Sequence, residues 1–375
     1  MELPERRSNL TDLRAIGIHP DFWYPIARAR ELKPRATLAA TFAGEPIVLA
    51  RTDTGSVFAL EDRCAHRQVP LHLGVVQGEQ LKCCYHGWCY DSKGKLARIP
   101  YLSDGGGGKL PPEARGVRSY PCREAYGLIF IFPGAPEMAE RVAFPEVLEF
   151  SSADYRTMYF SREVKCHYTF MHENLMDMNH QFLHRSLMGS IQPMLIDYRT
   201  GDTWVEARYK FEGGKQHAGA DFLVMGGKDE AAAVERDYEL MTIRTDYPHQ
   251  GLTVYRAHSE IPAIRLWASY VPLDAEQRRN RSFGLLMIRR PKIPGLLTLA
   301  WPVIRYFAES VFTQDRLAVE QEQNAHDAQG ADWNREISPV LLELRRVLDA
   351  NGVAPAVLAG NRARGARPTE KLRAV

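Results

Sequence analysis

The first third of the chain alternates short apolar runs with turn-forming residues. Runs rich in Val, Ile, Leu, Phe and Thr, bounded by Gly, Asp and Pro, indicate strands joined by tight turns. The clearest runs are residues 37–42, 46–52, 56–61 and 127–132. This spacing predicts a small all-β, antiparallel domain, which we place at residues 20–133.

The pattern changes after residue 140. Apolar positions at helical spacing over residues 165–188 are followed by strand-like stretches and then by two further helical stretches. The strand-like stretches are residues 203–211, 252–257, 265–273 and 282–290, and the late helical stretches are residues 309–329 and 338–348. An antiparallel sheet with late helices predicts an α+β second domain, at residues 134–360. Residues 361–375 then form a basic C-terminal tail.

Composition narrows the possible function classes. Apolar residues make up 45% of the chain and the formal net charge is only +2, which indicates a globular protein and argues against a nucleic-acid partner. The charged N-terminal segment lacks an apolar core, so we expect no signal peptide and a cytoplasmic protein. The uncharged apolar stretch at residues 293–304 is too short to span a bilayer. We expect it to be buried rather than to form a membrane-contacting surface.

Two short Cys/His pairs, C-A-H at residues 64–66 and C-C-Y-H at residues 83–86, are separated by sixteen residues. One thiolate and one imidazole from each of two loops can hold a 2Fe-2S cluster with both thiolates on one iron and both imidazoles on the other. A structural zinc site uses the same donors, but zinc loops more often pair like with like. The cluster is therefore favoured. Its predicted ligands are Cys64, His66, Cys83 and His86.

The remaining cysteines support a metal rather than disulfides. Three of the six cysteines lie within residues 83–89, which indicates reduced thiols. Cys83 completes the C-x-x-H spacing, so we expect Cys84 to be a small buried side chain beside the cluster. The cysteines without a partner spacing, which we expect in the core, are Cys89, Cys122 and Cys166. His72 lies between the two loops and receives no role.

The segment HENLMDMNHQFLHRS, residues 172–186, carries a second group of metal-binding side chains. On an α-helix, His180 and His184 face the same side, one turn apart, and can bind one metal ion. Two imidazoles and one carboxylate leave open positions on ferrous iron for dioxygen and a substrate. A pair of surface histidines on an amphipathic helix is the plain alternative, which the neighbouring cluster motif disfavours.

Both segments resemble those of the Rieske non-heme iron oxygenases. The motif CAHR…CCYHGWCYD carries the resemblance over about residues 20–132. The pattern N-x-x-D-x-x-H…H, formed by Asn174, Asp177, His180 and His184, extends it over most of the chain. The resemblance implies a Rieske 2Fe-2S domain followed by a catalytic domain of the helix-grip, START-like fold.

The resemblance also implies a mononuclear Fe(II) site. Its histidines are His180 and His184, although the family separates them by four or five residues and only three lie between them here; His172 is the alternative. The third ligand is a late carboxylate in a Glu/Gln-Asp pair that opens a helix, and residues 314–315 supply Asp315 in that context. The weaker alternatives are Asp327 and Glu320.

An assembly and an electron donor follow from the same resemblance. Asp177, with Asn174 near it in the catalytic segment, is expected to hydrogen-bond His180 of its own chain and His86 of the partner subunit. A carboxylate that hydrogen-bonds a ligating imidazole orients its ring. Transfer across a head-to-tail interface implies a homotrimer. The chain has no G-x-G-x-x-G on a strand-to-helix turn, so electrons are expected from a separate NAD(P)H-dependent reductase or ferredoxin.

The predicted function is a terminal oxygenase that uses O2 to hydroxylate or oxidatively demethylate a small apolar or aromatic compound. The single-chain form and the N-L-M-D string favour this over cis-dihydroxylation of an aromatic ring. Non-catalytic alternatives are a ligand-binding Rieske protein and a zinc-stabilised structural protein. Candidate pocket walls, which are equally typical of plain core, are Met225, Tyr255, Trp267, Met287 and Trp301.

Overall fold

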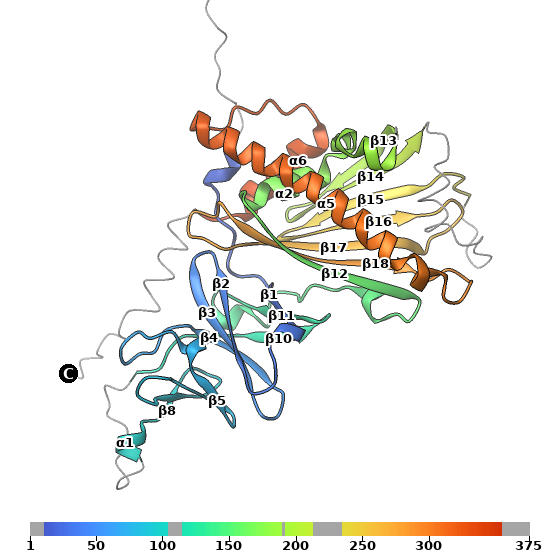
Figure 1. The fold of residues 1–375 in the computed structure, drawn as a ribbon. Helices are drawn as coiled ribbons and strands as arrows, with labels where there is room; N and C mark the ends of the chain where they lie inside the picture. The colour runs from blue at the N-terminus through green and yellow to red at the C-terminus, as the bar shows by residue number, and fades with distance from the viewer. Residues whose placement is uncertain (1–10, 104–114, 190–191, 213–234, 355–375) are drawn as a thin grey trace, which may run out of the picture. The chain divides into compact units, whose positions relative to one another are not determined.

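The computed structural model divides the chain into two compact units (Figure 1). The described residues are 11–103, 115–189, 192–212 and 235–354. One unit contains residues 19–144 and 273–276, and the other contains residues 11–18, 145–272 and 277–352. The domain limits expected from the sequence stay predictions. The expected tail at residues 361–375 and the candidate pocket residue Met225 lie outside the described residues.

The smaller unit, residues 19–144, consists of three antiparallel sheets with strand orders β1-β11-β10, β2-β3-β4-β9 and β5-β6-β7-β8. Its strands are β1 (Tyr24–Arg28), β2 (Thr37–Phe42), β3 (Glu45–Arg51), β4 (Val57–Glu61), β5 (Val75–Gln77), β6 (Gln80–Lys82), β7 (Cys89–Tyr90), β8 (Leu96–Arg98), β9 (Ser119–Tyr120), β10 (Cys122–Ala125) and β11 (Leu128–Ile131). Its helical turns are η2 (Ala29–Glu31), η3 (Leu71–Leu73), α1 (Pro100–Ser103) and η4 (Pro136–Met138).

A single apolar cluster joins the second and third of these sheets. Phe58 and Leu60 of β4 pack with Leu81 of β6, and the buried Cys64 and Cys83 belong to the same cluster. Each Cys/His loop follows a strand of these sheets: the first comes after β4, and the second connects β6 to β7. The core of the unit therefore positions both loops.

The larger unit is built on one seven-stranded antiparallel sheet with the order β12-β18-β17-β16-β15-β14-β13 (Figure 1). Its strands are β12 (Tyr155–Val164), β13 (Gln192–Thr200), β14 (Trp204–Glu212), β15 (Leu240–Asp246), β16 (His249–Tyr255), β17 (Pro262–Pro272) and β18 (Asn280–Arg289). From β13 to β18 each strand pairs with the next in sequence, and the first strand, β12, closes the far edge beside β18. Long apolar runs in β17 and β18 bury most of their residues.

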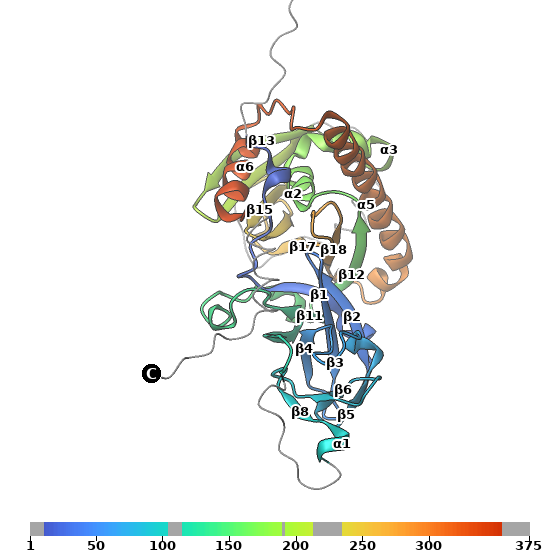
Figure 2. The same ribbon diagram turned by 90° about the vertical axis from the view of Figure 1, so that its left-hand side faces the viewer.

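Helices cover one face of this sheet. They are α2 (Tyr168–Met176), α3 (Arg185–Met188), α5 (Leu296–Gln329) and α6 (Pro339–Asn351), with the short turns η1 (Leu13–Ala15), η5 (Leu148–Ser151) and η6 (Met178–His184). Figure 2 shows α2 between α5 and α6, and α2 contacts both helices as well as β15 and β17. Gly295 and Gly330, both with positive φ, bound the 34-residue α5. This α+β arrangement is the one expected from the sequence.

The single helix expected over residues 165–188 is three separate elements. They are α2, which ends at Met176, the 3₁₀ turn η6 over residues 178–184, and the short helix α3 over residues 185–188. Asp177 separates the first two with an extended backbone (φ −80°, ψ 93°), and its side chain accepts a hydrogen bond from the Asn179 amide. An aspartate that bonds its local backbone in this way competes with helix formation. The expected α-helical i, i+4 relation of the histidines is therefore wrong.

The apolar stretch at residues 293–304 is not the buried segment expected from its composition. It forms the start of α5, in which Leu297, Ala300 and Ile304 face the interior. Leu299 on the opposite side is 81% exposed. The stretch is thus part of an amphipathic helix, with one face buried and the opposite face exposed. Within the described parts of the chain, no helix combines the length and apolar character needed to cross a membrane.

A buried charge network fixes α2 against the N-terminal segment and α6. Glu173 of α2 lies 2.7 Å from Arg14 and 2.5 Å from Arg345, and Arg345 also lies 2.6 Å from Asp332. The Arg14 and Arg345 side chains are only 3% and 5% exposed. Charges this deeply buried need their partners, because an uncompensated buried charge is strongly destabilising.

We predict that Glu173→Gln destabilises the larger unit by about 3–5 kcal/mol, because it keeps the side-chain volume but leaves two buried guanidinium groups short of one carboxylate. Chemical denaturation followed by circular dichroism measures the loss. Glu343→Gln is the matched control, since it removes the carboxylate of an exposed pair with Arg346 and should cost less than about 1 kcal/mol. Equal stability of both variants would contradict the prediction.

Candidate metal centres

The two Cys/His loops of the smaller unit close in the same way. The Cys64 amide donates to Val69 O, and the Gln68 amide donates back to Cys64 O, each over 2.9 Å. In the second loop the Cys83 amide donates to Trp88 O over 2.8 Å, and the Gly87 amide donates to Cys83 O over 3.2 Å. The pattern is therefore repeated residue for residue from each cysteine.

Each loop needs a left-handed residue four positions after its cysteine. Gln68 has φ 61° and Gly87 has φ 70°. A Cβ at Gly87 would also lie 2.9 Å from the Pro100 ring, so this position favours glycine for two reasons. The glycine of the H-G-W sequence is thus required by the turn that presents His86.

The two loops bring their four predicted ligands to one place. Cys64 and Cys83 are buried in the apolar core, whereas the His66 and His86 rings lie 4.5 Å apart, centroid to centroid, and are half-buried. The Trp88 ring stacks on His66 at 4.7 Å. Thiols therefore group on the inner side and imidazoles on the outer side, which is the asymmetry that a cluster with two kinds of iron ligand requires.

The chemistry of these side chains fits a bound cluster. Burial raises the pKa of the Cys83 thiol to about 11, so its thiolate form at neutral pH depends on a bound cation. Desolvation, and then the nearby His86 and Arg67, lower the pKa of His66, which keeps that imidazole neutral. His66 Nδ1 is buried and has no hydrogen-bond partner among the described residues. It is available to bind a metal.

Tyr90 connects the cluster loops through its hydroxyl group. The Tyr90 hydroxyl oxygen accepts a hydrogen bond from the Ala65 amide over 3.1 Å and lies 3.2 Å from Cys64 Sγ. A Cys64 thiolate bound to iron could only accept, so toward a bound cluster the Tyr90 hydroxyl group would be the donor. Burial raises the pKa of Tyr90, so the phenol stays a donor.

Asp62 and His72 brace the first loop. The Asp62 carboxylate accepts from the His72 amide over 2.7 Å and lies 2.5 Å from His72 Nδ1. Asp62 is buried and stands two residues before Cys64. His72, for which no role was predicted, therefore helps to hold the chain that leads into the loop.

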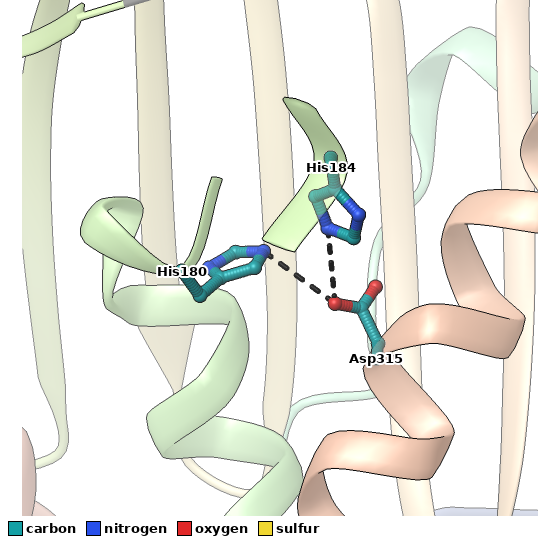
Figure 3. A group of neighbouring side chains, drawn as sticks. All are labelled: His180, His184 and Asp315. Carbon is teal, nitrogen blue, oxygen red and sulfur yellow. Dashed lines mark ion pairs between the residues drawn. The ribbon is translucent and has the colours of Figure 1, made fainter. Parts of the chain in front are cut away.

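In the larger unit, His180, His184 and Asp315 come together (Figure 3). Asp315 Oδ1 lies 3.1 Å from His184 Nε2 and 3.6 Å from His180 Nε2, and one donor atom from each residue lies within 4.8 Å of the others. The two imidazole rings are perpendicular, at 89°. These separations suit ligands around one first-row metal ion, whose bonds are about 2.0–2.2 Å long.

Both imidazoles present the same nitrogen to Asp315. His180 Nδ1 contacts the main-chain carbonyl of Asp177, and His184 Nδ1 lies 2.8 Å from Gln314 Oε1. A carbonyl oxygen only accepts, so these contacts place a proton on each Nδ1, and each Nε2 faces Asp315, where it can bind either a proton or a metal ion. His184 Nε2 and Asp315 Oδ1 are buried and have no hydrogen-bond partner in the described structure. A metal ion between these atoms satisfies both.

Comparisons with known proteins match both parts of the chain. Residues 22–121 match the model of the Rieske [2Fe-2S] domain, and residues 164–350 match the model of the vanillate O-demethylase oxygenase C-terminal domain. The chain belongs to the Rieske non-heme iron oxygenases. It is therefore an oxidoreductase of that family, whose cofactors are a Rieske 2Fe-2S cluster and mononuclear non-heme iron.

Relatives cover the chain to different extents. The 4β-methylsterol monooxygenase of Methylococcus capsulatus is 29% identical over 92% of this chain and 90% of its own length. The oxygenase component of dicamba O-demethylase from Stenotrophomonas maltophilia is 34% identical over 51% of this chain and 56% of its own length. The crystal structure of dicamba monooxygenase bound to dicamba shares the fold, with a TM-score of 0.68 at 24% identity over 94% of this chain and all of the other.

In the structure of this Rieske oxygenase, the alternative ligands considered from the sequence lie outside the His180, His184 and Asp315 group. His172 is fully buried on α2 against the ring of Tyr270 and is not part of the His180, His184 and Asp315 group. Asp327 pairs with Arg278, and Glu320 accepts from the Lys165 amide and pairs with Arg316. Asp315 is in the middle of α5 rather than at the opening of a helix, as expected from the resemblance.

Other expectations need correction. Cys84 is exposed rather than buried beside the cluster, because the two inner positions of the C-x-x-H turn point outward, as the exposed Tyr85 also does. Cys89 and Cys166 are buried as expected, but Cys122 is only half-buried. Among the candidate pocket residues, Trp267 and Met287 are buried, and Tyr255 and Trp301 are half-buried.

Asp177 interacts with His180 differently from the expectation. Its main-chain carbonyl, not its carboxylate, contacts His180 Nδ1 within the chain, because the carboxylate caps the 3₁₀ turn at Asn179. Asn174 lies half-buried on the last turns of α2. The sequence offered no signal for the main-chain contact, which depends on the break after α2.

We predict that Tyr90→Phe lowers the reduction potential of the cluster, because hydrogen bonds to the ligand sulfurs stabilise its reduced, more negative form. A redox titration followed by the paramagnetic signal of the reduced cluster measures the shift. Tyr101→Phe, at an exposed tyrosine of the same unit, is the control and should leave the potential unchanged. A wild-type potential in Tyr90→Phe would show that the hydroxyl group does not tune the cluster.

Proposed function

We propose that this chain is the terminal oxygenase of a multicomponent system and that its two centres are those formed by the Cys/His loops and by His180, His184 and Asp315. The observation that carries the proposal is the convergence of the Asp315 carboxylate and the two Nε2 atoms in the same chain as a Rieske domain. A Rieske domain alone transfers electrons. The second site adds a place for oxidation chemistry.

In the proposed iron site three side chains would hold the metal. His180 and His184 each offer an unprotonated Nε2, and Asp315 offers Oδ1. Iron bound to two imidazoles and one carboxylate supplies open positions at which O2 is activated beside a substrate. The protein holds the three donors, fixes the tautomer of both imidazoles and keeps the site largely dry, since His184 is buried.

In the proposed cluster site, Cys64 and Cys83 hold one iron and His66 and His86 hold the other. The neutral imidazoles raise the potential above that of an all-thiolate cluster. The name of one relative, the oxygenase component of dicamba O-demethylase, describes one component of a larger enzyme system. We infer an NAD(P)H-dependent reductase or a ferredoxin as the donor, which delivers electrons one at a time to the cluster.

We further infer that the working pair of centres forms between subunits of a homotrimer. His86 is half-buried and its neighbour Tyr85 is 59% exposed, so the imidazole side of the cluster can approach another molecule. The Asp177 carboxylate uses Oδ1 to cap the 3₁₀ turn, and its side chain is half-buried beside His180. In this proposal it also accepts a hydrogen bond from His86 of the partner subunit.

The proposed substrate is a small apolar or aromatic compound that is hydroxylated or loses a methyl group by oxidation. Two relatives support this class by their names, a methylsterol monooxygenase and a dicamba O-demethylase. Hydroxylation of a bound methyl or methoxyl carbon accounts for both outcomes, because a hydroxymethyl ether releases formaldehyde. Ring cis-dihydroxylation is the alternative, and its product is a dihydrodiol.

We predict that the purified chain, with its cluster intact and supplied with ferrous iron and a surrogate ferredoxin and reductase, consumes O2 in the presence of a methoxylated aromatic compound or a methylsterol. Oxygen uptake and mass spectrometry of the products measure this. Asp315→Ala should retain the cluster absorbance, but its rate of substrate-dependent O2 uptake should fall by at least about 100-fold. Asp327→Ala, on the same helix but outside the site, is the control. Retained turnover in Asp315→Ala would remove that residue from the site.

We predict that Asp177→Asn slows electron transfer between the centres by about 10–100-fold, the usual effect of losing an outer-sphere carboxylate, while both cofactors remain bound. Asparagine caps a helical turn as well as aspartate does, so the local fold should persist. Reoxidation of the reduced cluster in a single turnover with substrate and O2 measures the rate. Asp246→Asn, at an exposed carboxylate on β15, is the control. An unchanged rate in Asp177→Asn would contradict the bridging role.

A further inference from the structure

Two adjacent residues of α5 contact the two nitrogens of one imidazole. Asp315 Oδ1 lies 3.1 Å from His184 Nε2, and Gln314 Oε1 lies 2.8 Å from His184 Nδ1. The Gln314 amide nitrogen donates to Ser186 Oγ over 3.3 Å. The two contacts hold the Gln314 side chain between the ring and Ser186, with the amide oxygen placed toward His184 Nδ1.

The contact positions the His184 ring. With the amide oxygen 2.8 Å from Nδ1, the ring is held so that Nε2 faces Asp315 Oδ1 over 3.1 Å. Nε2 is therefore the ring nitrogen left to bind, together with the carboxylate, either a proton or a metal ion.

The two histidines differ in how they are held. The His180 ring contacts the main-chain carbonyl of Asp177, which no substitution of a side chain removes. His184 ends the 3₁₀ turn at its junction with α3, and it depends on the side chain of Gln314. The orientation of His184 is therefore the part of the site that a side-chain substitution can disturb. His184 is also the histidine that follows the short three-residue spacing.

We propose that Gln314 is a positioning residue of the iron site: it fixes the tautomer and orientation of His184 from the residue next to Asp315. This inference rests on the proposed function, because it assigns a task to a neighbour of the proposed ligands. It explains why a glutamine precedes the aspartate in the middle of α5, where an exposed helix position would not require one. Ser186 supports Gln314 in this task.

The test measures metal binding separately from activity. Wild-type protein and the variants Gln314→Leu and Gln314→Glu are freed of mononuclear iron with the cluster retained, and ferrous iron is titrated back against a competing chelator. Leucine has a similar size but no acceptor, so the affinity for iron should fall by about 10–100-fold. Glutamate keeps an acceptor toward Nδ1 and should bind iron at least as tightly as wild type. Gln321→Leu, at an exposed position of α5, is the matched control.

A structural role for Gln314 would give a different result. It would lower the unfolding temperature of the iron-free protein in Gln314→Leu, and glutamate would not restore it. We expect the unfolding temperature and the cluster absorbance of that variant to match those of Gln321→Leu. Wild-type iron affinity in Gln314→Leu would overturn this inference alone. Failure of the wild-type chain to bind mononuclear iron would overturn the proposed function and this inference together.

Discussion

The approach of the Asp315 carboxylate to the imidazoles of His180 and His184 is the constraint that the larger unit has to satisfy. It joins α5 to η6 across more than a hundred residues of sequence, so it exists only when the sheet, α2 and α5 are all in place. The seven-stranded sheet supplies the platform, and the Glu173 network holds α2 on it. The sheet, α2 and α5 together therefore position the three donor atoms, which are Asp315 Oδ1 and the Nε2 atoms of His180 and His184.

The break at Asp177 shows how local structure adjusts this frame. An uninterrupted α-helix through residues 165–188 would place the histidines one regular turn apart, but it would keep the Asp177 carbonyl in the helix hydrogen-bond ladder. In the 3₁₀ turn that carbonyl instead accepts from the His180 amide over 3.0 Å and also contacts His180 Nδ1, and the turn brings His184 beside Gln314. The short spacing between the histidines is thus compatible with a common metal site because the turn around them is not α-helical.

The sequence predicted the cluster loops well because their geometry is local. Each loop closes on itself within six residues, so the spacing of Cys and His carries most of the information. The exposure of Cys84 was missed because a spacing does not tell which way the inner residues of a turn point. Likewise, Asp315 was identified through resemblance, but its place within a 34-residue helix was not, since helix limits depend on Gly295 and Gly330 and on packing.

Long-range partners were the part that sequence reasoning could not supply. Gln314 stands 130 residues from His184, and although the Gln-Asp pair drew attention to Asp315, nothing in the sequence indicates that the glutamine contacts that histidine. The role of His72 could not be predicted either. Its partner Asp62 is only ten residues away, but the pair forms around a loop whose path cannot be read from the sequence. Side chains that orient a ligand, unlike the ligands, have no characteristic spacing.

The two centres also differ in how their burial serves electron flow. In the smaller unit the thiols of Cys64 and Cys83 are 2% and 3% exposed, whereas the imidazoles of His66 and His86 are half-buried. In the proposed cluster the imidazole side, rather than the apolar core, would therefore be the side that faces an electron-transfer partner. In the larger unit His184 is buried and His180 lies nearer the surface, next to Asp177. In the proposed iron site His180 would thus face the incoming electron, whereas His184 lies on the drier side.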